Sequence, residues 1–188
     1  MKEVEILVEV KSDKENVMKA LAVFESGGIK RVLDIYFFDP SRKDLKPDKN
    51  NRLRASLRIR KKGDKASVTY KKDYFEDNDE WIYSDEHETA VEDFDMMVHI
   101  FELTGLKELV RVENEKYIFY TPEYEVVFED VKGLGYFLEV ELLHQVSDDE
   151  VGAAKEKIRS FIRKLGIEVG KELNAGKPEL MLRELHPS

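Results

Sequence analysis

Residues 133–143 read Gly-Leu-Gly-Tyr-Phe-Leu-Glu-Val-Glu-Leu-Leu, a strongly apolar stretch that contains two acidic side chains. Successive side chains of a β-strand point to opposite faces, so Glu139 and Glu141 share one face. Val140 and Leu142 share the other, which predicts a strand with one buried and one polar face. A carboxylate pair within such an apolar run suggests a functional site.

The same alternation occurs in two other segments. Residues 3–11 place Val and Ile on one side and Glu3 and Glu5 on the other, and residues 52–60 place Arg58 and Arg60 opposite an apolar face. Such a polar face, taken alone, is typical of a strand that meets solvent. Hard oxygen ligands in pairs nevertheless suit Mg²⁺ or Mn²⁺, and arginine and lysine suit a polyanion. If the sheet curls with these faces inward, it could hold a metal-chelated phosphate chain such as a triphosphate.

The pattern along the whole chain predicts about eight strands and three or four helices, mostly joined by hairpins, which is an α+β fold with a large antiparallel sheet. Ser12 is predicted to cap a helix that Gly27-Gly28 ends, with strand 32–39 next. Strands are predicted at 81–91, 108–120, 123–131 and 136–143, and a helix at 93–104. Ser147-x-x-Glu150 predicts a capped long helix that ends at Gly166.

Composition limits the classes of protein. The chain has 188 residues, a formal net charge of −9, 38% charged residues and no cysteine. Cysteine chemistry is therefore excluded, and the acidity argues against a nucleic-acid partner. We expect no membrane partner, because no long apolar run occurs, and no signal peptide, because the first residues are acidic. A cytoplasmic protein forming one domain over 1–188 is expected, and the Glu- and Lys-rich composition fits a thermophile.

The order of these segments resembles the CYTH superfamily, the triphosphate tunnel metalloenzymes, over nearly the whole chain. The segments that carry the resemblance are Glu3-x-Glu5, Asp34-x-Tyr36-Phe37 with Asp39, Leu57-Arg58-Ile59-Arg60, Thr69-Tyr70-Lys71, Glu86-x-Glu88 and Gly133-Leu134-Gly135-Tyr136-Phe137-Leu138-Glu139-Val140-Glu141.

This resemblance implies an eight-stranded antiparallel β-barrel, or tunnel, with helices packed outside. It also implies that glutamates bind Mg²⁺ or Mn²⁺ while basic residues hold the phosphates. The implied catalytic residues are Glu3, Glu5, Glu139 and Glu141, which also bind metal together with Glu129. The implied phosphate-binding residues are Arg58, Arg60, Lys71 and Lys116.

The sequence departs from the family pattern at several positions. Leu7 stands where the opening motif has lysine, unless the register slips so that Glu9-x-Lys11 is the match. Ser84 stands where an arginine precedes the Glu86-x-Glu88 pair. A site with fewer basic residues than the family pattern would fit an altered substrate, or a site that binds its ligand without turnover.

The leading hypothesis is a metal-dependent enzyme that hydrolyses a nucleoside, thiamine or inorganic triphosphate. An adenylyl cyclase of the class IV type, which converts ATP to cyclic AMP, is the nearest alternative. A phosphate- or nucleotide-binding module of weakened activity and an ordinary α+β domain with solvated polar faces are the others. The sequence leaves the oligomeric state open, a homodimer included.

Overall fold

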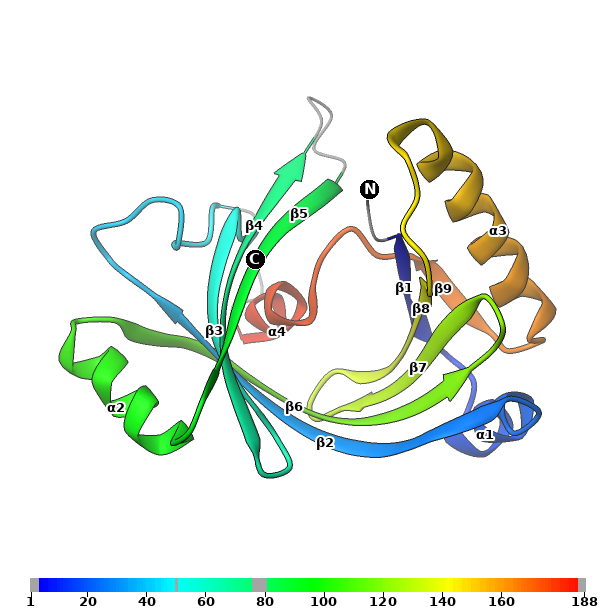
Figure 1. Ribbon diagram of the computed structural model, residues 1–188, viewed down its shortest axis with the longest axis horizontal. Coiled ribbons are helices and arrows are strands. Elements are labelled where there is room, and N and C mark those ends of the chain that lie inside the picture. The colour runs from blue at the N-terminus through cyan, green and yellow to red at the C-terminus, as the bar shows by residue number, and fades with distance from the viewer. Residues whose placement is uncertain (1–3, 50, 76–80, 186–188) are drawn as a thin grey trace. The chain divides into compact units, whose positions relative to one another are not determined.

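The computed structural model describes residues 4–49, 51–75 and 81–185. Within them the chain is α+β, with nine strands and four α-helices (Figure 1). The strands are β1 (Glu5–Val10), β2 (Glu25–Phe38), β3 (Ala55–Lys62), β4 (Lys65–Phe75), β5 (Trp81–Val91), β6 (Lys107–Tyr120), β7 (Tyr124–Val131), β8 (Gly135–Leu142) and β9 (Val169–Glu172). The helices are α1 (Lys14–Leu21), α2 (Phe94–Leu103), α3 (Val151–Lys164) and α4 (Lys177–Leu185), with a short 3₁₀ turn at Asp148–Glu150. None of these helices is long and apolar enough to cross a bilayer.

The strands form one sheet in the order β5-β4-β3-β2-β6-β7-β8-β1-β9. The described pairs with a printed register, such as β7 with β8, are antiparallel as predicted. The sheet differs from the prediction in having nine strands, since the four-residue strand β9 pairs with β1. β5 and β9 stand at opposite ends of this order, so over the described residues the sheet is open rather than a closed eight-stranded barrel.

The chain divides into two compact units, and the strands β2 and β6 run from one into the other. Unit 1 contains residues 1–30 and 114–173. Its core lies on one face of β1, β7 and β8, because alternate residues such as Ile6, Phe128 and Val140 are fully buried there. Val17 of α1 and Ile158 of α3 join this core. The other face of the same strands is therefore left for polar side chains.

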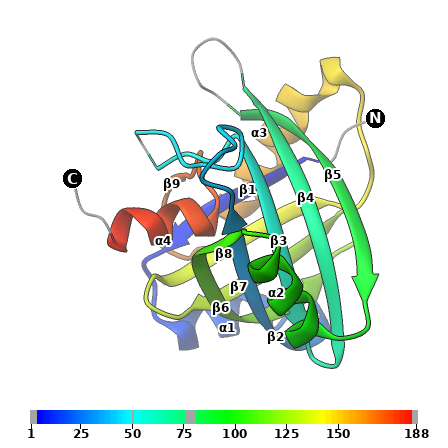
Figure 2. The same cartoon turned by 90° about the vertical axis from the view of Figure 1, so that its left-hand side faces the viewer.

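Unit 2 contains residues 31–113 and 174–188. Ile35, Phe37 and Ile59 form its core together with Phe94 of α2. The rings of Phe37 and Phe101 meet edge to face, with centroids 5.1 Å apart. Helix α2 thus covers one face of β2 and β3 (Figure 2), which leaves the opposite face of these strands polar.

Two local predictions near α1 were wrong. Asp13 rather than Ser12 caps the helix by accepting a hydrogen bond from the Asn16 backbone N–H. Gly27 and Gly28 lie inside β2 and do not end the helix, which finishes at Leu21. A Cβ on Gly27 would lie 2.7 Å from the Tyr120 ring and 2.8 Å from the Ile118 side chain. Gly27 therefore permits a close approach of β2 to β6. From a single sequence, a glycine with this role looks the same as one that ends a helix.

The predictions for helix α3 and its two ends were close to the structure. Ser147 and Glu150 form a reciprocal capping box before α3. Gly166 follows the end of α3 with a φ of 69°, a left-handed conformation that suits glycine. The predicted helix 93–104 and strand 81–91 are also confirmed, as α2 and β5.

Helix α4 is tied to the segment before β3 by one buried carboxylate. Glu179 is 7% exposed and accepts hydrogen bonds from the backbone N–H groups of Leu53 and Gly176, both at 2.8 Å. Burial raises the pKa of Glu179, and the two N–H donors oppose this rise without cancelling it.

The raised pKa predicts a pH-dependent stability. The contribution of Glu179 is full below its unfolded pKa of about 4.5 and is lost as the pH rises through the folded value. The free energy of unfolding of the wild type relative to Glu179→Gln should therefore fall across this window in urea titrations. The exposed Glu184→Gln variant should show no such trend, and a pH-independent difference for Glu179→Gln would contradict the assignment.

Candidate functional site

Unit 1 carries an acidic face, which we define by Glu5, Glu139 and Glu141. Glu5 of β1 stands directly opposite Glu141 of β8, and Glu139 lies two residues along the same strand. All three side chains are half-buried, whereas Ile6 and Val140 between them point into the core. The strand period predicted from the sequence thus brings these three predicted site residues together.

Leu7 lies on the acidic face, opposite Glu139. Strand β1 ends at Val10, so Lys11 lies beyond it, and its backbone N–H donates to the carbonyl of Glu168 at 2.9 Å. This favours the register in which Leu7, and not Lys11, occupies the lysine position of the opening motif. Glu3, predicted to belong to the same set, lies outside the described residues.

The acidic face suits a hard cation that is shared with a substrate. Among the residues described, no group of three or more His, Asp or Glu side chains is placed to hold a metal ion by itself. Mg²⁺ does not need such a group, since it is usually bound by one or two carboxylates plus water and substrate phosphates. Directly opposed residues of antiparallel strands have Cβ atoms about 4.5–5.5 Å apart. The Glu5–Glu141 pair therefore fits this kind of coordination.

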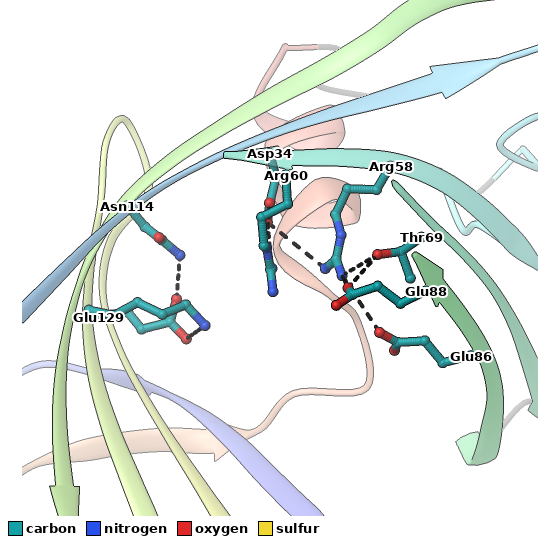
Figure 3. A network of polar contacts seen from close by, with 9 residues as sticks. Asp34, Arg58, Arg60, Thr69, Glu86, Glu88, Asn114 and Glu129 are labelled. Carbon is teal, nitrogen blue, oxygen red and sulfur yellow. Dashed lines mark hydrogen bonds and ion pairs between the residues drawn. The ribbon is translucent and has the colours of Figure 1, made fainter. Parts of the chain in front are cut away.

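Glu129, the fifth predicted acidic residue, has a different environment. Its side chain is completely buried, and Asn114 donates to Oε2 at 2.6 Å while the Lys116 ammonium lies 3.3 Å from Oε1 (Figure 3). Both carboxylate oxygens are thus engaged from β6. The Asn114 Oδ1 atom is itself buried and has no hydrogen-bond partner among the described atoms. Glu129 and Lys116, predicted for metal and phosphate respectively, form one ion pair, in which the glutamate is buried and the lysine partly buried.

Unit 2 carries a second polar face on β2, β3, β4 and β5, which we call the arginine face. One cross-strand row contains Tyr36, Arg58, Thr69 and Glu88, and the next contains Asp34, Arg60 and Ser67. Lys71 lies two residues beyond Thr69 on β4, opposite Glu86. The predicted phosphate-binding residues Arg58, Arg60 and Lys71 therefore share one face.

Arg60 is held tightly by Asp34. Its Nε and Nη2 atoms each donate to a different Asp34 carboxylate oxygen at 2.7 Å, and Asp34 is 4% exposed. Burial alone would lower the pKa of Arg60, but the hydrogen bonds and charge of Asp34 outweigh it and raise the pKa. Burial and the Asp34 charge also raise the pKa of Tyr36. Arg60 is therefore a fixed cation in a preset orientation.

Arg58 is held more loosely. Its Nη2 atom donates to the Thr69 hydroxyl at 3.0 Å and lies 3.7 Å from both Glu86 and Glu88 (Figure 3). Thr69 in turn donates to Glu88 at 2.8 Å, so this buried threonine links the arginine to a carboxylate. Unlike Arg60, Arg58 has no bidentate carboxylate partner among the described residues, and its guanidinium can take up an anion by exchanging longer ion pairs.

Sequence reasoning quoted Asp34 and Thr69 within family-like segments but gave neither a role in the site, and it missed Asn114 altogether. Asp34, Thr69 and Asn114 are buried beside Arg60, Arg58 and Glu129, respectively. Strand parity alone could have placed Asp34 and Thr69 on the arginine face, because each is an even number of residues from a neighbour on that face. Asn114 had the same signal, since it lies two residues before Lys116.

Residues 1–175 match the CYTH domain family. The chain belongs to the CYTH family. A relative from Methanocaldococcus jannaschii named "Putative adenylate cyclase MJ0240" is 31% identical over 170 residues, which cover 89% of this chain and 91% of the relative. The protein PH1819 of Pyrococcus horikoshii has 27% identity and a TM-score of 0.78, covering 97% of this chain and 99% of that one. A conserved hypothetical protein of Pyrococcus furiosus has 25% identity and a TM-score of 0.72, with 95% and 99% covered. Helix α4 lies beyond the part that matches this CYTH domain.

The buried Lys116–Glu129 pair predicts a strong and non-additive effect on stability. Lys116→Met leaves a carboxylate buried without its cation, which should lower the free energy of unfolding by about 3–5 kcal/mol. Adding Glu129→Gln should restore much of this loss, because the neutral amide still accepts from Asn114. Urea unfolding of both single variants and the double variant measures the coupling, and strictly additive losses would show that the pair is not coupled.

Proposed function

We propose that this CYTH protein is a metal-dependent enzyme that acts on a triphosphate, most simply by hydrolysis. The observation that carries the proposal is the arginine face, where fixed Arg60 and exchangeable Arg58 lie beside each other on β3, with Lys71 on the neighbouring strand. Two planar guanidinium groups can bind phosphate oxygens bidentately, and an ammonium adds a point charge. Family membership supports the same class of substrate.

In this proposal each polar face has a separate task. Arg58, Arg60 and Lys71 bind and orient the phosphates, whereas Lys116 is paired with Glu129. Glu5, Glu139 and Glu141 hold Mg²⁺ or Mn²⁺, together with Glu3, which precedes Glu5 by two residues in the sequence, and Glu129 supports them. When bound at these carboxylates, a divalent ion would supply positive charge and make its bound water more acidic. The protein's own contribution is to set the orientation of the phosphate chain before reaction.

Cyclisation of ATP is the second candidate, because the Methanocaldococcus jannaschii relative carries an adenylate cyclase name. The same arginine face would then orient the phosphates for attack by the ribose 3′-hydroxyl instead of water. Leu7 favours a third outcome, binding without turnover, because an apolar side chain replaces a cation on the acidic face.

Product analysis separates these candidates. Incubation with Mg²⁺ or Mn²⁺ and either ATP, thiamine triphosphate or tripolyphosphate should release phosphate if the enzyme hydrolyses its substrate. Cyclic AMP with pyrophosphate would instead establish cyclisation. A ligand at 100 times its Kd should stabilise the fold by about 2.7 kcal/mol, so a rise in Tm without product would indicate a binding module. No rise and no product would refute the proposal.

The acidic face can be tested by charge removal. The double variant Glu139→Gln and Glu141→Gln keeps the shape of both side chains but removes two hard ligands, so activity should no longer depend on the concentration of Mg²⁺ or Mn²⁺. Isothermal titration with Mn²⁺ measures the loss directly. Glu123→Gln with Glu168→Gln, two exposed glutamates of the same unit, is the matched control. Unchanged Mn²⁺ binding in the first variant would overturn this metal assignment.

The arginine face can be tested through substrate affinity. Arg58→Gln should weaken tripolyphosphate binding about 10- to 100-fold, because a hydrogen bond to a charged group contributes about 1.5–3 kcal/mol. Arg31→Gln removes a cation that is exposed in the same unit and serves as the control. Equal affinities of wild type and Arg58→Gln, measured by titration calorimetry, would exclude Arg58 from the phosphate site.

A further inference from the structure

Two guanidinium groups lie over one aromatic ring in unit 2. The Arg54 Cζ atom is 4.6 Å from the centroid of the Phe75 ring, and the Arg52 Cζ atom is 4.9 Å from it. Both contacts are within the range of cation–π attraction. We call these three residues the Arg-Phe cluster. Neither the hydrolytic nor the cyclising mechanism above uses them.

The cluster continues the arginine face. Arg54 lies an even number of residues before Arg58 and Arg60, and its carbonyl accepts a hydrogen bond from the Asp73 backbone N–H at 3.0 Å, which extends the β3–β4 ladder. Phe75 lies an even number of residues after Lys71 on β4. Alternation along this ladder places Arg54 on the same face as the proposed phosphate-binding residues. The register shifts between Tyr74 and Phe75, so it is the contact with Arg54 that brings the Phe75 ring to this side.

The separation along the strand suits one elongated ligand. Phe75 is four residues from Lys71 on β4, which at the rise of a β-strand is roughly 13 Å. This is the scale of a phosphate chain with an attached sugar. A triphosphate held by Arg58 and Lys71 can thus bring a terminal aromatic group to the cluster without leaving the face of unit 2.

We propose that Arg52, Arg54 and Phe75 bind the base of a nucleoside triphosphate, an inference that rests on the proposed function. A planar base can stack on a guanidinium group or on the ring face that an arginine vacates. Stacking of this kind tolerates different bases, because each has a π face. The cluster therefore selects for the presence of a base more than for its identity.

The charge of the cluster discriminates among aromatic groups. Residues 42–54 carry six Lys and Arg against two Asp, so the chain segment that ends in the cluster is strongly basic. Asp73, the neighbouring carboxylate, accepts a hydrogen bond from Ser84 at 2.5 Å and lies 4.0 Å from the Lys71 ammonium. A neutral nucleobase is attracted by guanidinium groups, whereas the cationic thiazolium ring of thiamine is repelled by them. The predicted substrate is a nucleoside triphosphate and not thiamine triphosphate.

Titration calorimetry with Mg²⁺ and three ligands tests this inference. The wild type should bind ATP at least tenfold more tightly than thiamine triphosphate. Arg54→Gln and Phe75→Leu should each weaken ATP binding about 5- to 100-fold, the range for loss of one stacking partner. Both should leave the affinity for tripolyphosphate, which has no base, within about twofold of the wild type.

Lys61→Gln is the matched control, because Lys61 also lies over a phenylalanine. Its Nζ atom is 5.5 Å from the ring centroid of Phe94, the first residue of α2. It should change neither affinity. Two results would overturn the base site while leaving the proposed function intact. One is an equal loss of affinity for ATP and for tripolyphosphate in both cluster variants, and the other is equal affinity of the wild type for ATP and for thiamine triphosphate. If the wild type binds none of the three ligands, the proposed function fails as well. A far-UV spectrum and a Tm for each variant establish that a loss of ATP binding is not a loss of folding.

Discussion

The two-residue period of the β-strand is the constraint on which both polar faces depend. In unit 1 it buries Ile6 and Val140 and, by the same step, turns Glu5 and Glu139 to the opposite side. In unit 2 it buries Ile59 under α2 and turns Arg58 and Arg60 away from that core. A slip of one residue in either register would move every charge into a hydrophobic core. The packing of the apolar faces therefore fixes where the chemistry can lie.

The charged residues on these faces differ in how much freedom the structure leaves them. Arg60 is bound bidentately by a buried aspartate, and Lys116 is paired with a glutamate that has no exposed surface. Desolvating such groups is expensive unless a partner is present, so their partners hold them in place. Arg58 donates to the neutral Thr69 hydroxyl, and its ion pairs with carboxylates of the described residues are 3.7–4.0 Å long. A preset cation next to an exchangeable one suits a site that must bind and then release a polyanion.

The sequence predicts which face of a strand a side chain occupies. It does not predict which residues from distant parts of the chain pack against that side chain. Glu139 and Glu141 could be assigned to one face because they alternate with buried residues, and the α+β class followed from the same pattern. The difference between Arg58 and Arg60 could not be foreseen, because both have the same spacing and differ only in the reach of Asp34 and Thr69. Gly27 looked like a helix stop because its contact with Tyr120, far along the chain, is invisible in local sequence. The ninth strand is too short for its pattern to be distinguished from a loop.

Leu7 has a physical consequence for the acidic face. It stands opposite Glu139 and one alternation from Glu5, at the position where a lysine would supply a cation. Without that cation, β1 contributes no positive charge between these carboxylates, and like charges on neighbouring strands repel one another. A face with one cation fewer attracts a divalent cation more strongly and an anion more weakly. Under the proposed function, the phosphate-binding cations are therefore those of the arginine face, and β1 supplies none.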